Sequence, residues 1–233
     1  MKENDMSKLP TLQHPTFETK IPSSGKTVTF RPFTGNEQKV LLVAKESKDS
    51  KDMLRAVAQV VGTCFSLDAN SLAVFDLEFL FLALRAKSVN NKINVSVKDD
   101  VDGKRYDATV SLDDVEFNPG TGEKSFEVSQ GVGLKLRYPT VGAVLSAPKG
   151  DIDEWDMLAA SIESVWSGDD VTSASDVSRG ELKEWLMKLP LNAMQPIRDF
   201  FEKRPTVSIN VVYTRADGET VKKDVKGLGD FFD

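Results

Sequence analysis

The same order of sequence patterns occurs twice along the chain, and this repetition constrains the fold more than any other feature. Ile209-Asn210-Val211 repeats Ile93-Asn94-Val95 residue for residue. Each run is followed by an Asp-Gly pair, Asp102-Gly103 in the first half and Asp217-Gly218 in the second. A repeated order of this kind indicates a duplicated structural unit.

Each half is predicted to contain a β-hairpin, two or three helices and a second β-hairpin. In the first half, strand-type residues fill 17–21 and 26–30, and Pro22-Ser23-Ser24-Gly25 supplies turn residues between them. Apolar residues alternate with polar ones from Ile93 to Val97 and again from Tyr106 to Val110. We expect this second hairpin to close with a two-residue Asp-Gly turn. The predicted fold class is α+β with an internal duplication.

Three helical segments are predicted between the hairpins of the first half. Thr34 and Glu37 have the spacing of a capping box at the start of a helix. The next helix has one apolar stripe, which consists of Leu54, Val57, Val61 and Cys64. This stripe indicates that Cys64 belongs to the core. Residues 75–86 are apolar almost all round, which is typical of a central helix surrounded by other elements.

The second half is predicted to follow the same order with a longer helical part. Its first amphipathic helix is expected to carry Met157, Leu158, Ile162 and Val165. Trp155, Trp166 and Trp185 also fit helix faces. Ser178 and Glu181 form a second capping-box pattern, and a further helix carries Met194, Ile197, Phe200 and Phe201.

These patterns divide the 233 residues into four segments. Residues 1–15 are expected to form a flexible N-terminal arm, and 16–117 the first α+β repeat unit. Residues 118–124 form a linker, and 125–233 form the second repeat unit. If the units are duplicates, residues from Phe17 to Val115 superpose on those from Phe126 to Phe231. Phe231 then matches Val115 and is expected in the core.

Composition excludes several classes of function. A formal net charge of −6 and a pI near 5.0 argue against nucleic-acid binding, which needs a basic face. No apolar stretch approaches the roughly 20 residues of a membrane span, so we expect no signal peptide and no membrane anchor. The single cysteine allows no disulfide within one chain and no cysteine zinc site, which fits the cytoplasm.

The candidate catalytic and metal-binding residues do not have the number or the spacing that such sites require. His14 is the only histidine, so any serine or cysteine nucleophile would depend on it. The acids from Asp151 to Asp156 suit the positive end of a helix dipole and need no catalytic explanation. Asp100 and Asp102 imitate a calcium loop without its first and last ligands. We therefore predict a non-enzymatic protein with no catalytic residue, no cofactor and no bound metal.

Candidate partner-binding residues lie at two kinds of place. Asp102, Gly103, Asp217 and Gly218 are expected at the hairpin tips, and loops on a rigid scaffold commonly carry recognition.

Equivalent positions after the first hairpin of each half hold the other candidates, Arg31, Arg137 and Tyr138. An alternative interpretation makes the two arginines framework residues, which cap carbonyl groups where each hairpin meets its helix.

With these residues in view, the chain resembles the baseplate hub assembly protein family of T-even-like contractile-tailed phages. The resemblance extends from Leu9 to Phe232. It is carried by Leu9-Pro10, Thr16-Phe17-Glu18, Phe30-Arg31-Pro32-Phe33, residues 75–81, Leu84-Arg85-Ala86-Lys87-Ser88, Arg137-Tyr138-Pro139-Thr140, Phe200-Phe201-Glu202 and Gly229-Asp230-Phe231-Phe232.

The resemblance implies a part in building the central hub of the tail baseplate, as an assembly factor or as a resident subunit. It implies other baseplate hub or tail proteins as partners. It places the protein in the host cytoplasm during assembly, or in the virion tail baseplate. Two other hypotheses remain: a small-molecule-binding protein with a site between the repeats, and a hydrolase with an acidic site.

This sequence departs from the family pattern at the hairpin turns. Many family members carry cysteine pairs at both turns, which suggests small zinc knuckles. Here the turns are formed by 99–103 and 215–218, which contain no cysteine. Metal binding is therefore not carried over to this chain.

Overall fold

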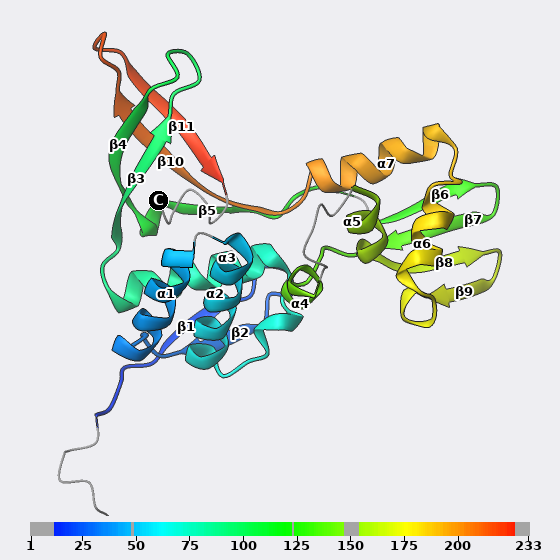
Figure 1. The fold of residues 1–233 in the computed structure, drawn as a ribbon, viewed down its shortest axis with the longest axis horizontal. Helices are drawn as coiled ribbons and strands as arrows, with labels where there is room; N and C mark the ends of the chain where they lie inside the picture. Colours follow the sequence, from blue (N-terminus) through cyan, green and yellow to red (C-terminus); the bar gives the residue numbers. More distant parts are fainter. Residues whose placement is uncertain (1–11, 48, 123, 147–153, 227–233) are drawn as a thin grey trace, which may run out of the picture.

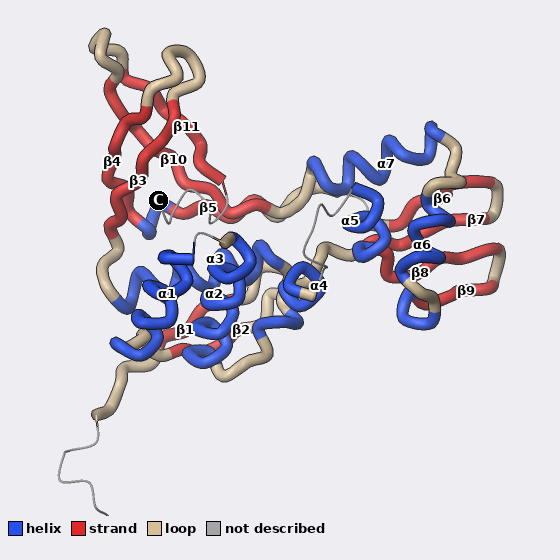
Figure 2. The backbone as a smooth tube through the Cα atoms, in the orientation of Figure 1, coloured by secondary structure: helices blue, strands red, loops and turns tan. Residues whose placement is uncertain are grey.

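The structure is a computed structural model that describes residues 12–47, 49–122, 124–146 and 154–226. Helices and small antiparallel sheets form an α+β fold with three hydrophobic cores (Figure 1, Figure 2). Most of the predicted N-terminal arm, residues 1–11, lies outside the described residues, and so does Phe231. No helix of the described part of the chain is long and apolar enough to cross a membrane.

The first body packs a hairpin against helices around one core. The amphipathic stripe of its second helix buries Val57, Val61 and Cys64, as predicted. Burial raises the pKa of the Cys64 thiol to about 11, which makes it an inert core group. The elements of this body are β1 (Phe17–Lys20), β2 (Thr27–Phe30), α1 (Gly35–Ser47), α2 (Ser50–Phe65), η1 (Ala69–Ser71), α3 (Val74–Ser88) and α4 (Val141–Leu145).

Helix α4 comes from the second half of the chain and completes the first core. Val141 is fully buried there, and its backbone N–H donates to the Leu72 carbonyl at 2.9 Å. Thr140 forms an antiparallel bridge with Ala73. The two halves of the sequence are therefore joined at this point by packing as well as by the chain.

The second body is a four-stranded antiparallel sheet with three helices that pack into the same core. Its core contains Leu134, Ile162, Ile197 and Phe200, each 0% exposed. The predicted capping box at the start of its second helix is confirmed at Ser178. The elements are β6 (Ser125–Ser129), β7 (Val132–Leu136), α5 (Glu154–Ser161), β8 (Ile162–Ser167), β9 (Asp170–Ser173), η3 (Ala174–Asp176), α6 (Arg179–Leu186) and α7 (Leu191–Glu202).

One helix prediction is wrong in this body. Helix α5 ends at Ser161, and Ile162, Val165 and Trp166 lie in strand β8. Val165 pairs with Leu134 of β7, so the two apolar side chains meet across strands rather than along a helix. Gly168, with φ of 58°, turns the chain into β9.

The third body is an arm of two sheets packed face to face. One sheet is the β3–β4 hairpin, and the other has the order β11-β10-β5. Alternate residues of both hairpins, among them Val95, Val97 and Val211, form the core between them. The elements are β3 (Lys92–Lys98), β4 (Arg105–Ser111), η2 (Leu112–Asp114), β5 (Val115–Asn118), β10 (Thr206–Thr214) and β11 (Thr220–Lys226).

Several matched residues occupy corresponding places in the two halves. Ile93 and Ile209 each lie in the first strand of a hairpin. Arg31 and Arg137 each follow the second strand of a hairpin, and their backbone N–H groups donate to Cys64 and Ser161 near the ends of α2 and α5. The second half contains the β8–β9 hairpin where the first half has only η1. The duplication and its domain boundaries stay predictions.

Candidate functional site

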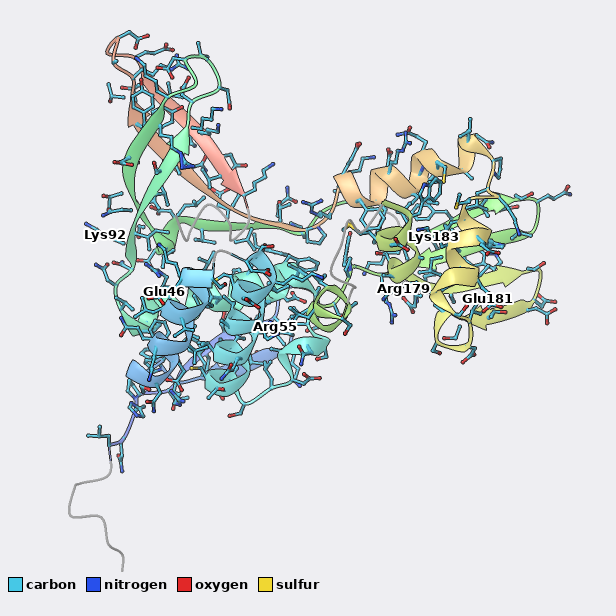
Figure 3. All side chains as sticks on the ribbon, in the orientation of Figure 1. Glu46, Arg55, Lys92, Arg179, Glu181 and Lys183 are labelled. Carbon is cyan, nitrogen blue, oxygen red and sulfur yellow. The ribbon has the colours of Figure 1, made fainter. Side chains whose placement is uncertain are left out.

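The tips of the two arm hairpins lie side by side at the end of the arm, away from the helices (Figure 1). The β3–β4 tip comes from the first half of the chain and the β10–β11 tip from the second. Polar side chains gather around both tips (Figure 3). These loops contain four of the residues predicted to bind partners, Asp102, Gly103, Asp217 and Gly218.

Both loops are longer than the two-residue turns predicted from the Asp-Gly pairs. In the first, the N–H of Asp99 donates to the Lys104 carbonyl at 2.8 Å, which leaves four residues between them. In the second, the N–H of Arg215 donates to the Glu219 carbonyl at 2.8 Å, which leaves three. Gly103 and Gly218 have φ of 70° and 88°, as glycines that end such loops commonly do.

Asp99 is the buried centre that joins the two tips. Its side chain is 1% exposed, and its Oδ1 accepts the N–H groups of Val101 and Asp102 at 2.8 and 3.0 Å. Its Oδ2 accepts from the Tyr213 hydroxyl at 2.5 Å and from Arg215 Nε at 2.8 Å. These four hydrogen-bond donors compensate the carboxylate for the water that it loses on burial. The first loop is therefore fixed to the second hairpin.

Two tyrosines extend the contact between the hairpins. The rings of Tyr106 and Tyr213 stack with centroids 5.1 Å apart. The Tyr106 hydroxyl donates to Asp102 Oδ2 at 2.7 Å and accepts the N–H of Ala216 at 3.2 Å. On the other side, Lys223 Nζ donates to the Lys98 carbonyl at 2.6 Å. Contacts on both sides hold the tips as one rigid unit.

The hydrogen bonds also set the charge states at the tips. The Tyr213 hydroxyl and the Arg215 guanidinium hold the pKa of Asp99 well below its usual range. The hydrogen bond to Asp99 raises the pKa of Tyr213 to about 12. At neutral pH, Asp99 is therefore a carboxylate and Tyr213 a neutral phenol. The two groups share a hydrogen bond in these charge states. This favours a structural role for the pair over a role in proton transfer.

The outer surface of the tips is acidic around one apolar side chain. Val101 is 77% exposed, and the Asp100 side chain beside it is 83% exposed. The predicted site residues Asp102, Gly103, Asp217 and Gly218 are all exposed. Besides buried Asp99, the two tip loops carry four exposed carboxylates, of which Asp100 pairs with Lys223 at 2.8 Å and Glu219 pairs with Arg215 at 2.7 Å.

Arg31 lies away from the tips and has framework contacts. Its Nη2 donates to Glu37 Oε1 at 2.8 Å, and its Nη1 donates to the Pro32 carbonyl at 3.0 Å. Glu37 also accepts the backbone N–H of Thr34 at 2.7 Å, as the predicted capping box requires. The Arg31 guanidinium lowers the pKa of Glu37 to about 2.

Arg137 and Tyr138 stand where the three bodies meet. Arg137 is exposed, whereas Tyr138 is half-buried and stacks on Phe200 of α7 with centroids 4.4 Å apart. The Tyr138 ring also meets Phe75 of α3 edge-on at 5.4 Å. Phe75 in turn lies 6.1 Å from Phe117 of β5. Tyr138 therefore links the helices of the first and second bodies, and the arm joins them through Phe75.

The acids proposed for a hydrolase are only partly described. Asp151 and Asp153 lie outside the described residues, Glu154 begins α5, and Asp156 pairs with Lys183 of α6 at 3.1 Å (Figure 3). Within the described ranges, no group of three or more His, Cys, Asp or Glu residues is placed to hold a metal ion.

A cavity of about 300 Å³ bears on the small-molecule hypothesis. It lies between α2, η1 and α4, and Arg55 lines it (Figure 3) together with Gln59, Asp68 and Leu145. Ligand pockets of this volume are usually lined by apolar side chains, whereas much of this lining is polar. The tips remain the stronger candidate.

Sequence reasoning missed Asp99, Tyr213 and Arg215 as a unit. The alternation that places Ile93, Val95 and Val97 in the core continues to Asp99, and the alternation of the other hairpin continues to Arg215. Extending both patterns by one more step would have placed Asp99 and Arg215 on the core-facing sides of their hairpins, although neither pattern shows that the two hairpins meet.

The comparisons with known proteins point to one family. A family model described as T4 bacteriophage base plate protein matches residues 14–233. No curated protein and no solved structure matches the chain.

Proposed function

Because the chain belongs to the T4 bacteriophage base plate protein family, we propose that it helps to build or forms part of the central hub of the tail baseplate. It acts through contacts with other baseplate hub or tail proteins and not by turning over a substrate. Its place of action is the host cytoplasm during assembly, or the finished baseplate when it stays as a subunit.

The rigid arm tip is the observation that carries this proposal. Hydrogen bonds of Asp99 hold the first loop to Tyr213 and Arg215 of the other hairpin before any partner binds. A loop that is already ordered loses little conformational freedom on binding, so more of the contact free energy appears as affinity. An extended arm with a fixed tip is suited to reach into a neighbouring subunit.

The chemistry of the tip defines the surface that it fits. Val101 offers an apolar anchor, and the exposed carboxylates of Asp100, Asp102 and Asp217 lie in the same pair of tip loops. The complementary surface is an apolar hollow with lysine or arginine side chains at its rim. Arg137, exposed at the junction of the bodies, provides a second place for contact.

Pull-down of the tagged chain from phage-infected cells tests the proposal. Val101→Asp is the test variant, because it places a charge where the anchor would be buried. Val171→Asp is the matched control, since Val171 is 70% exposed but lies on β9 of the second body. We expect the wild-type chain and the control to recover the same tail proteins, identified by mass spectrometry. The test variant should recover about tenfold less.

Two results would contradict the proposal. Recovery of no tail protein by the wild-type chain at low salt would exclude the assembly role. Equal recovery by Val101→Asp and Val171→Asp would exclude the arm tip as the contact surface.

A further inference from the structure

A groove of about 300 Å³ lies between α5 and the C-terminal half of α7, where α7 leads into the arm (Figure 1). Met157, which is 51% exposed, forms the apolar part of this α5–α7 groove together with Leu158 and Phe201. The charged part of the lining consists of Arg198, Glu202 and Arg204. The groove is therefore an apolar hollow with cations at its rim, which is the kind of surface that the arm tip fits.

The charges of the groove and of the arm tip are complementary. Arg198 and Arg204 are exposed, and neither has an ion-pair partner among the described residues. Glu202 is the one carboxylate of the lining, so the two arginines leave the groove positive. At the tip, Asp102 and Asp217 are exposed and have no cationic partner in the same described part of the chain. Two unpaired carboxylates thus match two unpaired arginines.

The groove also has room for the apolar anchor of the tip. Val101 is 77% exposed, and its backbone N–H donates to Asp99 Oδ1 at 2.8 Å. An engineered cavity of about 150 Å³ holds one benzene ring. The groove has about twice that volume, so it accepts a valine side chain with part of its turn. Because the turn is already fixed, little conformational freedom is lost when the anchor enters.

The tip cannot occupy the groove of its own chain. Strand β10 (Thr206–Thr214) has nine residues and connects Arg204 in the groove to Arg215 in the tip. Nine extended residues span about 30 Å. Figure 1 shows the tips at the far end of the arm, which points away from α5 and α7. A groove that receives a tip therefore belongs to a second copy.

We propose that the arm tip of one copy docks into the α5–α7 groove of a second copy. This rests on the proposed function, in which the arm tip is the contact surface, and it names a second copy of this chain as the partner. Val101 covers the apolar part of the groove, and the tip carboxylates approach the two arginines. Because tip and groove are different surfaces, the contact runs head to tail. Its repetition builds a ring when the rotation closes and a filament when it does not.

Sedimentation of the purified full-length chain tests this contact without any other tail protein. The tip variant is Val101→Asp, and the groove variant is Arg198→Glu with Arg204→Glu. The control is Arg179→Glu (Figure 3) with Lys188→Glu, because both residues are exposed cations of the second body outside the groove. Circular dichroism verifies the fold of each variant.

We expect the wild type and the control to associate as their concentration rises. The tip variant and the groove variant should each associate about tenfold more weakly. Added salt should weaken the association of the wild type, because it screens the exposed charges. An equal mixture of the two variants should restore dimers, since the intact tip of the groove variant meets the intact groove of the tip variant. The mixture should stop at two copies, because the remaining tip and groove are both altered.

Three results would overturn the inference. They are a wild type that stays monomeric up to its solubility limit, variants that associate as strongly as the control, and a mixture that forms no dimers. The last result would assign self-association to a symmetric contact. A monomeric chain that still recovers tail proteins from infected cells would leave the proposed function standing, with a different protein as the partner of the tip. Failure of the assembly role shows instead in that pull-down.

Discussion

Replacement of Glu37 by Gln tests whether Arg31 is a framework residue. Glu37 accepts hydrogen bonds from the Arg31 guanidinium at 2.8 Å and from the Thr34 hydroxyl at 2.6 Å, and its pKa falls from 4.5 to about 2. At about 1.4 kcal/mol per pH unit, this fall corresponds to about 3 kcal/mol. The Arg31 side chain is 31% exposed, so solvent screening reduces the expected contribution to about 2 kcal/mol.

The sign of the pH dependence follows from the lowered pKa. The carboxylate stabilises the folded chain fully above pH 4.5, its ordinary value, and this contribution is lost as the pH falls through about 2. In urea unfolding at about pH 7, Glu37→Gln should therefore be about 2 kcal/mol less stable than the wild type. The difference should shrink steadily below pH 4.5.

Glu46→Gln is the control for this experiment, because Glu46 is exposed on the same helix. It should unfold within about 0.5 kcal/mol of the wild type. The reasoning is refuted by a Glu37→Gln variant as stable as the control at about pH 7, or by a loss of stability that does not change with pH. Arg31 would then be available to a partner.

Two further predictions concern packing in the second body. Gly133→Ala should cost about 1–3 kcal/mol in urea unfolding, because the added Cβ would stand 2.0 Å from Cζ2 of Trp166, whereas Gly180→Ala meets nothing within 4 Å and should not destabilise. An equal effect of both would contradict the contact. Phe200→Ala should cost about 3–5 kcal/mol because Phe200 is fully buried, and Leu191→Ala should change little because Leu191 is 90% exposed. Similar costs for these two would contradict the core assignment.

Local patterns predicted most elements of this fold. The apolar character of residues 75–86 on all sides predicted helix α3. The alternation of apolar and polar residues from Ile93 predicted the β3–β4 hairpin. Both predictions depend only on residues close in sequence. The stripe that buries Cys64 in α2 is of the same kind.

The β8–β9 hairpin shows where local patterns fail. Ile162 and Val165 are three residues apart, a spacing that suits a helix face as well as it suits a strand with an irregular register. Pairing with β7 decides between them, and β7 lies more than 20 residues earlier in the sequence. Gly168, which has a positive φ, was a local sign of a turn between β8 and β9.

The joining of the two hairpins in one arm had no local signal of its own. Asp99 and Tyr213 are 114 residues apart, and only the fold brings them together. The glycines of both tips were predicted, but the buried carboxylate that holds the tips together was not. The same holds for α4, whose Val141 packs into the core of the other half.

Cross-linking within tail assemblies from infected cells tests the central claim most directly. An amine-reactive reagent would be applied, and cross-linked peptides would be identified by mass spectrometry. Lys104 is exposed in the first tip loop, and Lys188 is exposed just after α6 of the second body. The arm-tip account predicts cross-links from Lys104 to another tail protein and few from Lys188. Cross-links to tail proteins from Lys188 alone, or none from either lysine, would contradict it.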